Sequence, residues 1–203
     1  MSPVEKYDAQ CMSMGLLVEE QTPMIWRGPM VTQALEQLLT DTNWKDVDYL
    51  IIDLPPGTGD VQLTLCQKIP VSGAVIVTTP QDISLIDARK GLKMFEKVEV
   101  PVLGIVENMS THVCKKCGHI ESIFGEGGGE QLASEAGVKL LGELPLEKQI
   151  REEMDKGTPT VSSNPMDPAS LAYREIARKM TATLSMRKKD YSSAFPKIVI
   201  QND

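Results

Sequence analysis

Short, continuously apolar runs alternate with segments of helical periodicity along most of this chain. The clearest runs are Tyr49–Leu54, Gly73–Thr78 and Val102–Val106. Such runs are typical of strands buried on both faces of a sheet. Their alternation with helices predicts a mostly parallel sheet covered by helices on both faces. The predicted fold class is therefore a doubly wound α/β fold.

Weaker patterns predict the remaining elements. Further strands are expected at Met12–Val18 and Leu140–Leu144. Helices are expected in a segment opened by Pro29, at Val61–Ile69, in a segment capped by Asp82, and at Glu130–Ala136, Leu146–Lys156 and Asp167–Met186. We expect residues 1–186 to form one domain. Residues 187–203 are expected to form a solvated tail whose end adds an edge strand.

Composition and charge exclude several classes of protein. No apolar run approaches the roughly 18–20 residues of a membrane-spanning helix, and the first residues lack the pattern of a secretory signal. Lys and Arg number 21 against 28 Asp and Glu, which gives a net charge of −7. No overall basic field therefore favours nucleic acid or anionic lipid. We expect a cytoplasmic protein with neither nucleic acid nor membrane as a partner.

The first apolar run ends in a carboxylate, Asp53, followed by a Pro-Pro-Gly-Thr-Gly turn. In doubly wound sheets, ligands bind beyond the carboxyl ends of the strands. In nucleotide hydrolases an Asp at this place holds Mg²⁺, directly or through its water. The turn's glycines let backbone N–H groups approach a γ-phosphate. The alternative is that Asp53 only caps the turn.

Polar residues also follow the next two predicted strands. Thr78 and Thr79 end the second run, and Asn108 lies just beyond the third. The Asn108 amide can donate to and accept from an adenine edge, although a turn-forming Asn is the simpler alternative. Because carboxyl ends of parallel strands meet at one edge, we expect Asp53, Thr78 and Asn108 to gather there.

Cys114 and Cys117 form a C-x-x-C pair. Two thiolates at this spacing can supply part of the ligand set of a zinc or iron–sulfur site, and the flanking lysines favour the thiolate form of the cysteines. No second C-x-x-C is present, so a four-thiolate site needs a second subunit. His112 and His119 could instead complete a zinc site within one chain, or be exposed loop residues.

Other cysteines and a glycine-rich run are expected to be structural. Cys11 and Cys66 are isolated on apolar stretches and are expected to be small buried residues. The run Phe124–Glu130 is not a phosphate cradle, because no apolar strand precedes it, its glutamates repel phosphate and no Gly-Lys follows. We expect it to be a flexible entry to the helix Glu130–Ala136.

Several motifs occur together in a fixed order. They are WRGPM (residues 26–30), DLPPGTGD (53–60), VTTPQ (77–81), VENMS (106–110), CKKC (114–117), IFGEGGG (123–129) and RE-x-x-D-x-G-x-P (151–159). In this combination the chain resembles the Mrp/ApbC family over about residues 10–179. Members of that family are iron–sulfur cluster carriers of the MinD-like class of P-loop ATPases.

The resemblance implies a homodimer that bridges a [4Fe–4S] cluster through Cys114 and Cys117 of both subunits and delivers it to iron–sulfur apoproteins. It also implies ATP and Mg²⁺, with Asp53 as the catalytic acidic residue of the second switch. The residues that it places near the nucleotide are Gly57, Thr58, Gly59, Asp60, Asn108, Pro145 and Arg151.

The sequence departs from the family at one motif. The Walker A sequence K-G-G-V-G-K-[ST] is not found, since no glycine in these 203 residues is followed by lysine. We therefore expect the N-terminal part of the family fold to be missing, with Met1 as an internal start, and ATP hydrolysis to belong to the complete family protein. A zinc-binding structural module and a MinD-like regulator without cluster transfer are the alternative functions.

Overall fold

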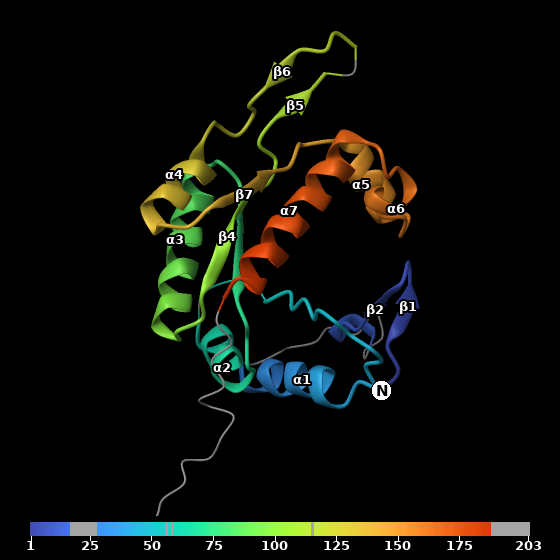
Figure 1. Ribbon diagram of the computed structural model, residues 1–203, viewed down its shortest axis with the longest axis vertical. Coiled ribbons are helices and arrows are strands. Elements are labelled where there is room, and N and C mark those ends of the chain that lie inside the picture. The colour runs from blue at the N-terminus through green and yellow to red at the C-terminus, as the bar shows by residue number, and fades with distance from the viewer. Residues whose placement is uncertain (17–27, 56, 58, 115, 188–203) are drawn as a thin grey trace, which may run out of the picture.

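A parallel three-stranded sheet lies at the centre of the structure, a computed structural model (Figure 1). The strand order is β3-β4-β7, and both neighbouring pairs are parallel. The strands are β3 (Ala74–Thr78), β4 (Val102–Glu107) and β7 (Leu140–Glu143). The structure describes residues 1–16, 28–55, 57, 59–114 and 116–187, so the predicted edge strand at the end of the tail lies outside the described residues.

Helices cover both faces of this sheet, as Figure 1 shows. One face packs against α3 (Asp82–Lys97) and α4 (Gly128–Ala136), and the other packs against α7 (Pro168–Ser185). The two faces follow from the alternation of side chains along β4. Ile105 belongs to the apolar cluster under α3 and α4, whereas Val106 belongs to the cluster under α7. The predicted doubly wound α/β fold is confirmed.

The remaining elements surround this core. The elements that precede β3 in the chain are β1 (Val4–Lys6), β2 (Ala9–Cys11), the short 3-10 helix η1 (Met14–Leu16), α1 (Gly28–Thr40) and α2 (Asp60–Lys68). Beyond β4 lie β5 (His112–Val113), β6 (Ile120–Glu121), α5 (Lys148–Asp155) and α6 (Thr160–Ser163). Among the described helices, none combines the length and the hydropathy needed to cross a membrane.

The predicted strand Tyr49–Leu54 is wrong. The segment has no regular secondary structure, and the side chain of Ile51 is 72% exposed. A strand needs a neighbour to satisfy its backbone N–H and C=O groups. Within the described residues β3 pairs only with β4, so this run is not paired to the sheet. Only its end contributes to the core, through the half-buried Leu54.

Smaller predictions also need correction. The described part of Met12–Val18 contains η1 instead of a strand, and residues 17 and 18 lie outside the described residues. Gln81, with extended dihedral angles, is the N-cap of α3, and Asp82 is the first helical residue. Cys66 is buried as predicted, but Cys11 is exposed, because β1 and β2 form a separate two-stranded sheet.

Gly104 gives a direct test of the β4–β7 packing. A Cβ atom at this position would lie 2.6 Å from the Lys139 carbonyl oxygen and 2.6 Å from Leu141 Cγ. Because a backbone atom cannot easily move aside, we expect Gly104→Ala to lower the free energy of unfolding by about 1–3 kcal/mol. Urea unfolding followed by circular dichroism measures this change.

The matched control is Gly91→Ala in α3, where the nearest atom to the new Cβ is Ile76 Cδ1 at 3.6 Å, an ordinary contact. This change should leave stability unchanged or raise it by up to about 1 kcal/mol, because alanine favours helix. Equal unfolding midpoints for Gly104→Ala and the unmodified chain would contradict the described packing of β4.

Candidate functional site

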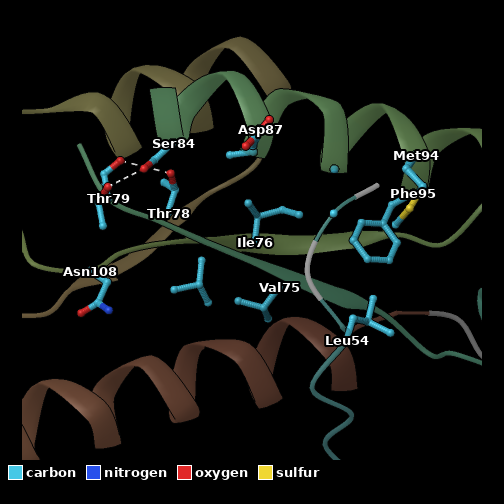
Figure 2. Close-up of a pocket in the computed structure, with 14 residues that line it drawn as sticks. Leu54, Val75, Ile76, Thr78, Thr79, Ser84, Asp87, Met94, Phe95 and Asn108 are labelled. Atoms are coloured by element: carbon cyan, nitrogen blue, oxygen red, sulfur yellow. Dashed lines mark hydrogen bonds between the residues drawn. The ribbon is translucent and has the colours of Figure 1, made fainter. Parts of the chain in front are cut away.

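The carboxyl ends of β3 and β4 form a polar edge. The Asn108 N–H donates to the Thr78 carbonyl oxygen at 2.7 Å, which joins the two strand ends. The Asn108 Oδ1 accepts a hydrogen bond from the Met109 N–H at 3.0 Å. Beside them, the Thr79 hydroxyl donates to the Ser84 Oγ at 2.8 Å (Figure 2). The predicted proximity of Thr78 and Asn108 is thus confirmed.

A pocket of about 570 Å³ extends from this edge along β3. Figure 2 shows Thr79 and Asn108 at one end and Leu54 and Phe95 at the other. Val75 and Ile76 of β3 line the middle of the pocket, and the carboxylate Asp87 of α3 lies above them (Figure 2). The site therefore combines a polar end with a longer, mainly apolar groove that carries one acidic side chain.

Asp53 does not join Thr78 and Asn108. It is exposed, and its neighbour Leu54 lines the end of the pocket far from Asn108 (Figure 2). The prediction that all three gather at one edge is therefore wrong for Asp53. The reason is that the strand expected to bring Asp53 to the carboxyl edge is not formed.

The turn after Asp53 leads to the start of a helix. Gly57 lines the pocket and has a φ of +100°, which is readily accessible only to glycine. Gly59 is the N-cap of α2 and, as a glycine, supplies no side-chain cap hydrogen bond. An uncapped helix start of this kind suits a phosphate group. Thr58 lies outside the described residues, as does the side chain of Asp60.

The other predicted nucleotide residues lie just after β7 and on α5. Pro145 follows β7 and is half-buried. Arg151 is on α5, and its Nη1 forms a 2.7 Å ion pair with the Asp155 Oδ2. The side chains of both partners are 63% exposed, so this pair is of the surface kind that contributes little to stability. The structure thus leaves Arg151 accessible to solvent.

Cys114 and Cys117 lie at the tip of a hairpin that projects from the sheet (Figure 1). We call residues 112–121, which comprise β5, β6 and the turn between them, the cysteine arm. The Cys114 N–H donates to the His119 carbonyl oxygen at 2.9 Å, and the Gly118 N–H donates to the Cys114 carbonyl oxygen at 2.8 Å. These bonds hold both cysteines in one tight turn, with Cys114 half-buried and Cys117 exposed.

The turn favours the thiolate of Cys114. Hydrogen bonds from the backbone N–H groups of Cys117 and Lys116 lower the pKa of this thiol, and the Cys117 side chain and the nearby His112 add to the effect. Partial burial acts in the opposite direction and is the smaller influence. The thiolate is the metal-binding form of cysteine. The predicted direction is therefore confirmed for Cys114, and its largest cause is hydrogen bonding from the backbone.

The residues that the structure describes do not form a zinc site within one chain. The His112 Nδ1 lies 3.0 Å from the Leu146 carbonyl oxygen. Across the described residues, no group of three or more His, Cys, Asp and Glu side chains is placed to hold a metal ion. Within the described residues, neither His112 nor His119 therefore completes a set with the two cysteines.

Glu107, the last residue of β4, was not predicted as part of the site. Its side chain is 1% exposed, and its Oε2 accepts a hydrogen bond from the Gly129 N–H at 2.5 Å. Burial raises the pKa of this carboxyl group, and the Gly129 N–H opposes that shift. The sequence signal was available, because a carboxylate directly after an apolar strand is the same pattern that singled out Asp53.

The glycine-rich run also differs from its prediction. It was expected to be a flexible entry to the helix Glu130–Ala136, but α4 already begins at Gly128. Gly128 and Gly129 are buried, and a Cβ on Gly128 would lie 2.8 Å from Leu85 Cδ1. These glycines therefore allow close packing of α4 on its neighbours.

Comparison with known proteins agrees with this fold. The chain matches the family described as "ParA: NUBPL iron-transfer P-loop NTPase" over residues 1–181. An iron–sulfur cluster carrier protein of Pseudomonas fragi is 59% identical over 175 residues, which cover 86% of this chain and 61% of that protein. The protein of the same name from Escherichia coli K12 is 57% identical over 184 residues, which cover 91% of this chain and 50% of that protein.

A solved structure shows the same fold. It is a nucleotide-binding protein from Archaeoglobus fulgidus in complex with ADP, with a TM-score of 0.68 and 32% identity, covering 85% of this chain and 65% of that one. The present chain spans about half to three-fifths of the length of the two curated relatives. The family match and these identities establish the kinship that the motifs indicated: the chain belongs to the NUBPL iron-transfer P-loop NTPases, the ParA/Mrp-type family of iron–sulfur cluster carriers.

Proposed function

We propose that two copies of this chain hold one [4Fe–4S] cluster between their cysteine arms and deliver it to iron–sulfur apoproteins. The observation that supports this most is the thiol pair at the tip of a projecting hairpin, Cys114 and Cys117. A cluster of this type is usually held by four cysteine thiolates. One arm supplies two of them, and a second copy related by two-fold symmetry supplies the other two.

The chemistry of the arm suits a cluster that is cargo and not a permanent cofactor. Cys117 is exposed, and the turn favours the thiolate of Cys114. A cluster bound at such a tip stays accessible to the thiolates of a recipient protein. Transfer by ligand exchange then replaces one iron–thiolate bond by another, with no change in the oxidation state of the cluster.

We also propose that ATP and Mg²⁺ act in the complete family protein. Asp53 would serve near the metal ion, the turn Gly57, Thr58, Gly59 and Asp60 near the γ-phosphate, and Asn108, Pro145 and Arg151 near the adenine. The described residues fit such a ligand only in part. Gly59 opens a helix without a side-chain cap, but Leu54, the neighbour of Asp53, lies at the far end of the pocket from Asn108. We therefore assign no hydrolytic step to this chain.

The first prediction concerns thiol reactivity in the metal-free chain. Because the pKa of Cys114 is lowered, its alkylation rate should persist at pH values below about 8.5, where an ordinary thiol loses reactivity. Cys66 should react slowly throughout, because burial both shields it and raises its pKa. Mass spectrometry of iodoacetamide-treated peptides over a pH series measures both rates. A Cys114 profile that coincides with that of glutathione would contradict the prediction.

The second prediction concerns assembly. Anaerobic reconstitution with ferrous iron and sulfide should give a dimer with visible sulfur-to-iron charge-transfer absorbance. Cys117→Ser should abolish both the colour and the dimer, because each copy then offers too few thiolates. The matched control is Cys11→Ser, which removes another exposed thiol outside the arm and should change neither property. Absorbance and size-exclusion chromatography with light scattering provide the readouts.

Two outcomes would contradict the proposed function. One is a monomer that binds a complete cluster. The other is stoichiometric zinc on the two cysteines in a chain that accepts no iron and sulfide, which would favour a structural zinc module. A cluster-loaded dimer that transfers its cluster to an apoferredoxin supports the carrier role over a purely regulatory one.

The third prediction concerns nucleotide hydrolysis. Phosphoryl transfer depends on positioning and on charge stabilisation at the β- and γ-phosphates, for which one arginine finger alone is worth on the order of 10³–10⁵ in rate. The Walker A lysine motif is not in this sequence. We expect the 203-residue chain to show no magnesium-dependent ATPase activity above background in a phosphate-release assay. Turnover that disappears in Asp53→Asn would overturn this expectation.

A further inference from the structure

The cysteine arm belongs to one excursion of the chain between β4 and α4. The excursion leaves the sheet after Glu107 and returns at Gly128, the first residue of α4. The arm itself consists of two strands of two residues each, and an isolated two-stranded hairpin is at best marginally stable in water. The direction of the arm therefore depends on how its two ends are held.

The outgoing end is held by a series of backbone bonds. The Ser110 N–H donates to the Leu144 carbonyl oxygen at 3.0 Å, and the Leu146 N–H donates to the Thr111 carbonyl oxygen at 2.7 Å. The Glu107 carbonyl oxygen accepts from the Leu144 N–H at 2.8 Å. The outgoing chain is thus fastened to the segment that follows β7.

The returning end relies on a different contact. Gly125 and Gly127 have φ values of +106° and +68°. Directly after Gly127 the chain enters α4, whose first two residues are buried. There the buried Glu107 carboxylate accepts the Gly129 N–H, across 22 residues of sequence. The fit is close, since a Cβ on Gly129 would lie 2.9 Å from Glu107 Cβ and 3.0 Å from its Oε2. This hydrogen bond joins the residue where the excursion starts to the helix where it ends.

A carboxylate that is buried in the core, as in Glu107, is unfavourable in free energy compared with an apolar side chain. Burial of a carboxyl group costs free energy unless hydrogen bonds compensate for it. Here the acceptor lies at the start of α4, where the helix dipole favours negative charge. Charge repulsion from the neighbouring Glu143 and Glu130 disfavours the ionised form of Glu107. An apolar side chain would fill the space at lower cost but could not bind the N–H.

We propose that Glu107 is the positioning residue of the cysteine arm. By binding the Gly129 N–H it closes the base of the excursion and fixes the direction in which Cys114 and Cys117 point. This inference rests on the proposed function, because two arms can present four thiolates to one cluster only if each has a defined orientation. It adds to that function a buried residue, seven positions from the nearer thiol, that acts through the arm and not as a cluster ligand.

The test compares three variants of the full 203-residue chain. Glu107→Ala removes the acceptor, whereas Glu107→Gln retains an acceptor oxygen of the same reach. Leu132→Ala on α4 creates a cavity at a residue that is 1% exposed and destabilises the same helix without touching the Glu107–Gly129 bond. Amide hydrogen exchange of the metal-free chain reports the arm directly, and chelator-induced loss of a reconstituted cluster reports its function.

We expect Glu107→Ala to speed amide exchange in residues 112–129 by about tenfold, as a local opening would, while β3 and β4 keep their protection. Cluster loss should accelerate by about 10-fold, the lower end of the effects seen when groups that orient metal ligands are removed. Glu107→Gln should stay within about twofold of the unmodified chain on both readouts. Leu132→Ala should lower overall stability without selective opening of the arm.

Three results would overturn the inference: unchanged arm exchange in Glu107→Ala, equal opening in Glu107→Gln and Glu107→Ala, or the same selective opening in Leu132→Ala. If the unmodified chain takes up no cluster, the proposed function fails. The exchange data on the metal-free chain then still decide whether Glu107 holds the arm, so the two failures remain distinguishable.

Discussion

The parallel pairing of β4 with β3 on one side and β7 on the other is the interaction on which the rest of this structure depends. β4 contributes Ile105 to one apolar cluster and Val106 to the other, so a single strand links the helices on both faces. Its central place leaves no room for a side chain at Gly104. The same strand ends in Glu107 and Asn108, from which both functional regions begin.

Adjacent residues at this strand end serve different regions. The backbone of Asn108 joins the polar end of the pocket through Thr78, whereas the side chain of Glu107 reaches the start of α4 and the base of the cysteine arm. Pro80, in the loop after β3, lies within 3.5 Å of where side chains on Gly125 and Gly128 would begin. The returning chain of the arm therefore packs directly against the loop that borders the pocket.

The sequence predicted those elements whose signal is local and whose partners lie nearby. β3, β4 and β7 follow from short apolar runs, the apolar face of α7 follows from helical periodicity, and C-x-x-C identified the thiol pair. The run Tyr49–Leu54 has the composition of a buried strand, but a strand forms only with a neighbour, which composition cannot supply. The position of Glu107 directly after an apolar strand is a local signal, but its partner Gly129 lies 22 residues away, so the contact itself could not be predicted from a local pattern.

The free edge of β3 affects how copies of this chain behave together. In the described part of the chain no strand pairs with this edge, and Val77 of the same strand is 61% exposed. Unpaired strand edges act as templates for strands of other molecules, and the exposed Tyr49 and Ile51 add apolar surface. A net charge of −7 opposes such contacts. Salt screens the repulsion between copies but does not remove the unpaired edge of β3. Self-association of this chain therefore depends on the balance between strand pairing at that edge and repulsion between negative surface charges.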